Sequence, residues 1–287
     1  MTNIPTPRLL LSTLLPYLKT AGAYAREIQS RIGVRPQKDY PENAFAAALS
    51  DADLSVQNFV EVALLAHFPQ VRFFGEEHEQ SANTKYFRAI DLGEAGDYLV
   101  TLDPIDGTRF YLDGHPNYQV ILCVLDRDEF QGVLALSPSE NAYYYALRGE
   151  GAFRGTLDDA FEAAQQFHIE SKHPTVYLGL GLTPIAQALK DRYTVVDLAV
   201  AYSPDVAVPN FSKMLANELT GAILDSGKFI DGAALAFVAQ EAGCIVTTFD
   251  GSPPPPLHEC DNYERPGLLV AASETVHQDL LEAVRSR

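Results

Sequence analysis

Residues 103–108 read DPIDGT, and residues 75–77 place a glycine and two glutamates upstream. Carboxylates that crowd together repel each other, so a chain that gathers Asp103, Asp106 and Glu76 is expected to hold a hard cation such as Mg²⁺ between them. The glycine and threonine that close the segment add a turn with N–H groups suited to a phosphate. The pattern predicts metal-assisted chemistry on a phosphate.

The order of residues within this segment also predicts its geometry. Pro104 fixes its own φ and keeps Asp103 extended, so Asp103 should finish a strand with its side chain held in one direction. Asp106 can face the same point in a tight turn, and Gly107 lets the backbone approach a ligand because it has no Cβ. An Asp-Gly pair alone more often marks an ordinary turn, so the prediction depends on the whole segment.

Two amphipathic helices are predicted ahead of these motifs. Apolar residues recur with helical spacing over residues 8–32, with a kink or restart at Pro16. A second helix is expected to begin at residues 50–53. The residues expected on its buried face are Leu54, Phe59, Val62, Leu65 and Ala66.

Strand-like runs follow the two helices. Residues 71–74 and 98–102 are expected to be strands that end at Glu76 and at the aspartate turn. The polar segment 81–97 between them is expected to form a surface connection or a small hairpin. Three further β-rich runs predict an antiparallel meander over residues 118–126, 132–136 and 142–147.

The second half of the chain alternates short apolar runs with helical ones, which is typical of a layered α/β region. Strands are expected over residues 175–182, 194–200, 221–224 and 267–272. Helices are expected over residues 184–191, 211–219, 231–242 and 275–284, and a proline-rich surface loop over 252–266. We therefore expect an N-terminal α+β domain (1–155) that carries most metal ligands, and a C-terminal α/β domain (156–287).

Composition limits the partners. The 287-residue chain has a formal charge of −17, which disfavours a nucleic acid polymer as partner, although bound divalent cations would still admit a small phosphorylated substrate. The three cysteines show no disulfide or zinc spacing, which favours a reducing, cytoplasmic compartment. The apolar stretch 9–15 is a poor signal peptide and too short to cross a membrane.

Several motifs occur in an order similar to that of the inositol monophosphatase superfamily, the Mg²⁺-dependent, lithium-sensitive phosphatases that include inositol monophosphatases, bisphosphate nucleotidases and fructose-1,6-bisphosphatase relatives. Residues 103–108 and 75–77 resemble its aspartate and Gly-Glu-Glu motifs. Weaker matches are residues 51–53 with Lys38 upstream, GEGAF at 149–153, and 230–243, where Ile230 replaces the family's tryptophan. The resemblance covers nearly the whole chain and implies an α+β fold, a layered αβαβα sandwich.

The resemblance also implies roles for single residues, with two or three Mg²⁺ ions per subunit. The ligands it implies are Glu76, Asp103 and the Ile105 carbonyl for one ion, and Asp103, Asp106 and Asp231 for another. Glu76 and Thr108 would orient the attacking water, and the N–H groups of Gly107 and Thr108 would bind the phosphate. Asp53 would align Glu76 or a weaker third ion. On spacing alone, Asp231 would more often be a helix cap than a ligand, and Asp53 would look the same as a plain helix cap.

The substrate stays open. Inositol phosphatases carry a glutamate shortly before the motif of Asp231, and here either Asp225 replaces it or Leu224 stands in its place. We consider a phosphomonoesterase of inositol or sugar phosphates first. The alternatives are a 3′(2′),5′-bisphosphate nucleotidase, with Lys228 or Arg192 for the second phosphate, and a non-catalytic regulatory or interaction protein. The superfamily's usual state implies a homodimer.

Overall fold

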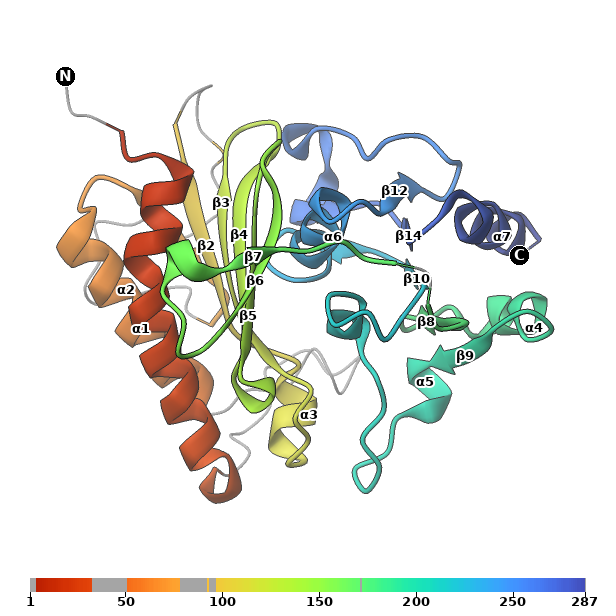
Figure 1. Cartoon of the computed structure of the whole chain (residues 1–287), viewed down its shortest axis with the longest axis horizontal. Helices are drawn as coiled ribbons and strands as arrows, with labels where there is room; N and C mark the ends of the chain where they lie inside the picture. The colour runs from red at the N-terminus through yellow and green to blue at the C-terminus, as the bar shows by residue number, and fades with distance from the viewer. Residues whose placement is uncertain (1–3, 33–50, 78–91, 93–96, 171, 287) are drawn as a thin grey trace.

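The computed structural model describes residues 4–32, 51–77, 92, 97–170 and 172–286. Its elements stack in the order helix, sheet, helix, sheet, helix, which confirms the predicted α+β sandwich (Figure 1). The expected features at Lys38 and across most of segment 81–97 lie outside the described residues. The division into domains 1–155 and 156–287 stays a prediction.

The outer helix layer begins with α1 (Pro7–Ile28), which is capped by Thr6 and followed by a 3₁₀ turn (Gln29–Arg31). The helix runs through Pro16 without a break, so the expected restart there is wrong, whereas the expected kink stays a prediction. The buried stripe continues on both sides of it: Leu10, Leu11, Leu14, Leu15, Leu18, Ala21 and Ala25. Packing of this stripe against the sheet offsets the backbone hydrogen bond that a proline cannot donate.

The second helix, α2 (Asp51–His67), begins where expected but presents a different face to the core. Phe59 and Val62, expected to be buried, are 41% and 49% exposed. The buried apolar residues are Ala52, Val56, Val60, Ala63 and Leu64. Apolar residues occur on several sides of this helix, so their spacing could not fix its rotation about its axis.

A seven-stranded sheet packs against α1 and α2. Its strands in order are β1 (Arg72–Gly75), β2 (Leu99–Asp106), β3 (Gln119–Leu125), β4 (Phe130–Ser137), β5 (Ala142–Leu147), β6 (Gly151–Thr156) and β7 (Gln165–Gln166). Only β1 and β2 pair in parallel, and the rest form the predicted antiparallel meander. Strand β2 leads into the short helix α3 (Thr108–Leu112).

A mixed five-stranded sheet forms the second β layer. Its strands in spatial order are β12 (Ile245–Thr248), β14 (Leu268–Ala271), β10 (Gly221–Leu224), β8 (Thr175–Leu178) and β9 (Thr194–Asp197). The helices of this half are α4 (Ala186–Leu189), α5 (Leu198–Ala201), α6 (Gly232–Glu241) and α7 (Glu274–Arg285). The remaining 3₁₀ turns are Pro138–Glu140, Phe161–Ala163, Thr183–Ile185, Phe211–Met214, Leu257–Glu259 and Asp261–Tyr263.

Three expectations for this half are wrong in detail. The helix expected over 211–219 is only a 3₁₀ turn, Phe211–Met214, whereas the helix expected over 184–191 is present as the turn Thr183–Ile185 continued directly by α4. The strand expected over 194–200 stops at Asp197, whose carboxylate accepts a hydrogen bond from Ala199 N and caps α5. The expected loop 252–266 contains β13 (Glu264–Arg265), which pairs with β11 (Gly227–Lys228).

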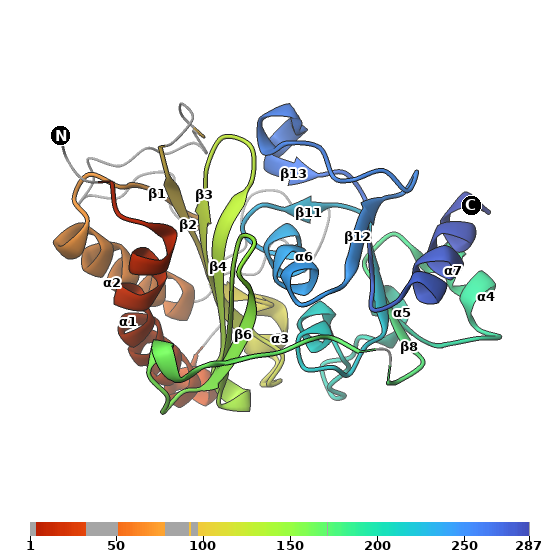
Figure 2. The same cartoon turned by 45° about the horizontal axis from the view of Figure 1, so that its top comes forward.

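Helix α6 forms the central layer between the two sheets (Figure 2). Its residues from Ala233 to Ala239 are all buried, as expected for a helix that packs on both sides. The strand β5 alternates in the same way: Tyr143 and Tyr145 face α1 and α2, whereas Tyr144 faces α6. The three tyrosines are therefore core residues that pack on opposite faces of the strand.

The end of α6 is fastened to the turn between β5 and β6. The carboxylate of Glu241 accepts hydrogen bonds from Gly149 N and Gly151 N, with N···O distances of 3.1 Å. Both glycines have positive φ values, 73° and 88°, which are strained for other residues. The GEGAF and Glu-Ala-Gly motifs, far apart in sequence, thus form one structural contact.

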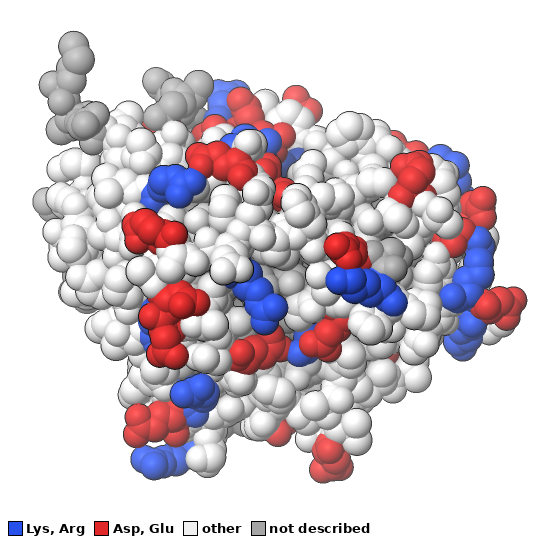
Figure 3. All heavy atoms as spheres, viewed as in Figure 1, with Lys and Arg blue, Asp and Glu red and all other residues white. Residues whose placement is uncertain are grey.

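The surface carries mixed charge. On the face shown in Figure 3, acidic and basic side chains are interspersed, and no extended basic area is visible. Among the described residues, no helix combines the length and the apolar character needed to cross a lipid bilayer. Cys123, Cys244 and Cys260 are free thiols, so the expected absence of a disulfide among them is confirmed.

Replacing Glu241 by alanine should destabilise the protein, because two backbone N–H groups lose a charged acceptor. We expect the free energy of unfolding in urea to fall by about 1.5 to 3 kcal/mol. Glu241→Gln, which keeps an acceptor oxygen, should lose less. The exposed Glu162→Ala is the matched control. Equal unfolding midpoints for Glu241→Ala and this control would show that the contact contributes no stability.

Candidate active site

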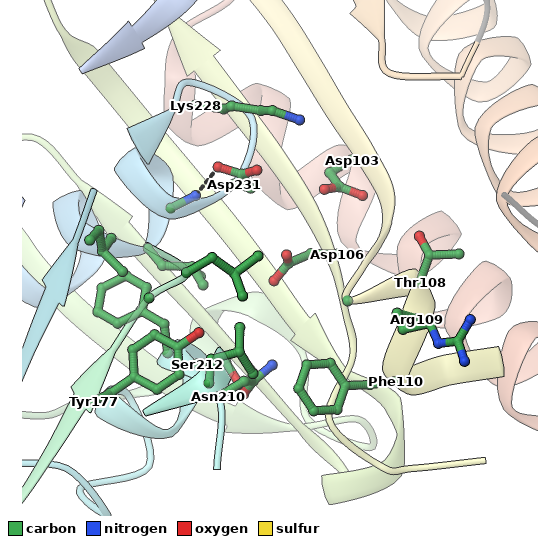
Figure 4. A pocket seen from close by; sticks show the side chains of 18 of the residues that line it. Asp103, Asp106, Thr108, Arg109, Phe110, Tyr177, Asn210, Ser212, Lys228 and Asp231 are labelled. Carbon is green, nitrogen blue, oxygen red and sulfur yellow. Dashed lines mark hydrogen bonds between the residues drawn. The ribbon is translucent and has the colours of Figure 1, made fainter. Parts of the chain in front are cut away.

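A cavity of about 450 Å³ opens where the two sheets approach each other, at the end of β2. Both halves of the chain contribute to its lining. The residues that bear on its chemistry are Glu76, Asp103, Ile105, Asp106, Gly107 and Thr108 from the first half, and Tyr177, Asn210, Ser212, Asp225, Lys228 and Asp231 from the second. Figure 4 shows Asp103, Asp106 and Asp231 pointing toward the same region of the cavity. The expected metal-binding, catalytic and substrate-binding residues other than Asp53 therefore line this cavity, whereas Arg192, the candidate for a second phosphate, does not.

The strands β1 and β2 deliver the first carboxylates. Their parallel pairing continues past β1, because Glu76 N donates to Leu102 O at 3.1 Å. Asp103 is 4% exposed, and its Oδ1 accepts a hydrogen bond of 3.1 Å from Ile105 N. The side chain of Ile105 is buried in the core, so only its backbone can face the cavity. The turn thus holds the Asp103 carboxylate in a fixed direction.

Gly107 allows the turn from β2 into α3. Its φ is 86°, and a Cβ added there would lie 2.7 Å from Asn117 O, closer than van der Waals contact allows. Helix α3 begins at the next residue, Thr108, so the N–H groups at this point lie at the start of a helical turn. The contact with Asn117 and the positive φ therefore require a glycine here, and the expected close approach of this backbone to a ligand stays a prediction.

Asp53 reaches this turn from α2. It is 0% exposed, and its Oδ1 lies 3.2 Å from Thr108 Oγ1, which also lies 2.9 Å from Ile105 O. A hydroxyl has one hydrogen and can donate it to only one of these acceptors at a time. Asp53 is therefore more than the plain helix cap that spacing alone allowed, because its side chain contacts a cavity residue 55 positions away.

Asp231 is contributed by the start of α6. Its carboxylate caps the helix by accepting from Gly232 N. Lys228 precedes it on β11, and its Nζ lies 3.9 Å from Glu76 Oε1. Asp231 is thus a helix cap that also lines the cavity, and its expected role as a metal ligand stays a prediction. Lys228 therefore stands among the carboxylates.

Arg192 does not belong to this site. Its guanidinium pairs with Asp279 and lies 3.6 Å from Glu282, both on α7, and it is not among the described lining residues. The expectation that it could bind a second phosphate is wrong. The sequence could not predict this pairing, because Arg192 and its partners on α7 are far apart in the chain.

Burial and mutual repulsion raise the pKa values of the clustered aspartates. Burial, then the charges of Asp231 and Glu76, raise the pKa of Asp106 to about 7. Burial raises the pKa of Asp231 to about 6, against the opposing charge of Lys228. Burial and the carboxylate of Glu76 raise the pKa of Asp103 well above its usual range. Each carboxylate would be ionised more readily beside a cation.

The donor set fits a hard cation. Carboxylates and one backbone carbonyl are the oxygen ligands that Mg²⁺ prefers, and neutralising them would remove the repulsion that raises their pKa values. In the described part of the chain, no three acidic, imidazole or thiol side chains converge tightly enough to hold one ion as they stand. Asp231 is hydrogen-bonded to Gly232 N, so binding would require this carboxylate to rotate or to share that hydrogen bond.

Gln57 supports the site and was missed by sequence reasoning. It is 1% exposed on α2, and its Oε1 accepts a hydrogen bond of 2.9 Å from Glu77 N. Gly75 leaves room for its amide, because a Cβ there would overlap it. Asp53, Gln57 and Glu61 recur every four residues and are all buried. This polar row was visible in the sequence, and it indicates the face of α2 that lies toward the site.

Comparison with known proteins identifies the family of this chain. The model of the inositol monophosphatase family matches residues 17–287. A putative Nus factor SuhB of Neisseria meningitidis is 26% identical over 279 residues, covering 94% of this chain and 98% of that protein.

Solved structures share the fold. An extragenic suppressor protein SuhB from Bartonella henselae superposes with a TM-score of 0.72 at 18% identity, covering 96% of this chain and 98% of that one. An IMPase/NADP phosphatase complexed with Mg²⁺ and phosphate gives 0.69 at 18% identity, covering 95% and 93%. At such low identity, these two structures establish the fold alone.

The raised pKa of Asp106 predicts a pH-dependent stability difference in metal-free protein. A carboxyl with a raised pKa binds a proton more tightly when folded, so it costs stability progressively as the pH rises from its ordinary pKa of about 4 to about 7. Asp106→Asn should therefore unfold with a free energy roughly 2 kcal/mol higher than the unsubstituted protein at pH 8, and with little difference at about pH 4.

Urea unfolding in the presence of a chelator at the two pH values measures this difference. Asp158→Asn, at an exposed position, is the control and should show no such change between them. An Asp106→Asn protein that gains no stability at pH 8 would contradict the assigned repulsion.

Proposed function

The chain belongs to the inositol monophosphatase family, and from that premise we propose that it is a Mg²⁺-dependent phosphomonoesterase. The substrate would be a small phosphorylated metabolite. Water would attack phosphorus, the ester P–O bond would break, and the alcohol would leave with a proton as inorganic phosphate forms. A homodimer and a cytoplasmic location remain predictions from the family resemblance and from composition.

One observation carries this proposal: the carboxylates of Glu76, Asp103, Asp106 and Asp231 line one cavity, although burial and the neighbouring negative charges raise the pKa values of the three aspartates. Such repulsion costs stability in a protein that has no cation to bind. The Ile105 carbonyl would complete the oxygen ligands. Bound Mg²⁺ would supply a more acidic water and charge stabilisation for the phosphoryl group and the leaving oxygen.

The protein's own groups would position the reactants. The Asp53 carboxylate accepts from the Thr108 hydroxyl, which leaves the Thr108 oxygen lone pairs to accept from the attacking water. Glu76 lines the same region and would orient that water as well. The N–H groups of Gly107 and Thr108, at the start of α3, would hold the phosphate.

A second candidate is a non-catalytic interaction protein. The similarity to the Neisseria protein favours this candidate, because that protein is named a putative Nus factor and the two chains are similar over nearly their whole lengths. The retained carboxylate cluster argues against it, because a protein without metal chemistry would gain stability by losing that repulsion. Of the two basic side chains considered for the second phosphate of a bisphosphate nucleotidase substrate, only Lys228 lines the cavity, because Arg192 pairs with residues of α7.

Asp103→Asn should abolish Mg²⁺-dependent phosphate release and leave the metal-free protein as stable as before or more stable, because the change relieves repulsion. Phosphate release would be measured over inositol phosphates, fructose-1,6-bisphosphate and adenosine 3′,5′-bisphosphate, with Mg²⁺ binding followed by calorimetry. If the unsubstituted protein releases no phosphate from these substrates and binds no Mg²⁺, the proposal of a Mg²⁺-dependent phosphomonoesterase is wrong. A strongly destabilised metal-free variant would argue against a metal role for Asp103.

Thr108 offers a matched pair of variants. Thr108→Val keeps the shape of the side chain but removes the hydroxyl that contacts Asp53, and we expect kcat to fall by about 10²-fold or more. Thr108→Ser keeps the hydroxyl and should stay within about tenfold of the unsubstituted enzyme. Steady-state kinetics at saturating Mg²⁺ measure both. Full activity in the valine variant would exclude the hydroxyl from positioning water.

A further inference from the structure

The end of the cavity away from the aspartates is mainly apolar. Its wall includes the buried side chains of Phe110, Tyr177, Phe211 and Leu224 and the half-buried Leu180. The rings of Tyr177 and Phe211 stack at 27° with their centroids 6.4 Å apart. In Figure 4, the rings of Tyr177 and Phe110 lie below the carboxylates of Asp106 and Asp231. The alcohol part of a bound ester would contact this wall.

Much of the polar surface at this end is already used within the protein. Asn210 Nδ2 donates to Asn117 O at 3.2 Å, and Asn210 Oδ1 accepts from Ser212 Oγ at 2.6 Å. Both Asn210 and Ser212 are 7% exposed. The Tyr177 hydroxyl can donate one hydrogen bond and accept another, and Asp225 and Ser226 lie at the exposed rim. A polyol would leave several hydroxyl groups without partners against this wall.

The cations of the cavity are already next to carboxylates. Lys228 and Arg109 are the basic side chains among its described lining residues. Lys228 lies beside Glu76, and the carboxylates around it raise its pKa, although burial opposes this. Arg109 Nε donates to Asp113 Oδ2 and lies 3.0 Å from the Tyr202 hydroxyl, and its side chain points away from Asp106 (Figure 4). A second anionic group on the substrate would therefore meet a poorly matched wall.

We propose that the preferred substrate is the phosphate monoester of an alcohol that carries a flat, largely apolar ring and no second anionic group. This inference rests on the proposed phosphatase activity and assigns the alcohol part of its substrate. The ring would pack against Tyr177, Phe211 and Leu180, while its phosphate lies near the aspartates. Apolar contact favours such a ring, and unpaired hydroxyls or a second charge disfavour the competitors.

The test compares kcat/KM for 2-phenylethyl phosphate, myo-inositol 1-phosphate and adenosine 3′,5′-bisphosphate at saturating Mg²⁺. We expect the phenylethyl ester to exceed each of the others by about tenfold or more. A faster reaction with the inositol phosphate or the bisphosphate would overturn the inference and leave the phosphatase proposal intact. Silence with all three would instead overturn the phosphatase proposal.

Leu180→Ser tests the wall directly, because the residue is half-buried and lines the cavity. We expect the ratio of kcat/KM for 2-phenylethyl phosphate over myo-inositol 1-phosphate to fall severalfold, by about threefold or more. Leu9→Ser, at a 49% exposed position on α1 outside this cavity, is the matched control and should leave the ratio unchanged. An unchanged ratio in Leu180→Ser would contradict the role of the apolar wall.

Discussion

Electrostatic repulsion among carboxylates is the constraint on which the rest of this structure depends. Asp103, Asp106 and Asp231 share one cavity with Glu76, and burial raises the pKa values of all three aspartates. Lys228 offsets a part of this repulsion. A fold that keeps these groups together must supply rigid supports for each of them, and their proximity is understandable if a cation normally neutralises them.

The supports come from elements whose positions are fixed by packing. The paired ends of β1 and β2 carry Glu76 and Asp103, and the buried helix α6 carries Asp231 at its start. The same helix fastens its other end to the sheet through Glu241. Because α6 is buried between both sheets, a shift of either sheet would move Asp231 relative to the strand ends. The central layer thus couples the global fold to the geometry of the carboxylate cluster.

The two ends of the cavity differ in chemistry. The aspartate end consists of carboxylates and backbone groups from one short segment and one helix start. The other end consists largely of apolar side chains from the strand and turns of the second half, such as Tyr177 and Phe211, whose rings stack. The first end is suited to a phosphate with its cations, and the second to the rest of the molecule. Specificity would therefore depend on segments that carry no recognisable motif.

The sequence by itself determined the motif residues and most of the element order, because proline and glycine restraints and apolar periodicity act over a few residues. The order of the motifs carried the family resemblance, and that resemblance implied the layered fold class. The sequence did not determine the rotation of α2, which buries Gln57 and exposes Phe59, or the continuity of α1 through Pro16. It also placed Arg192 near the cavity, and it predicted a helix over residues 211–219 where the structure has one 3₁₀ turn. Those outcomes were decided by tertiary packing, because they depend on contacts between segments far apart in the chain.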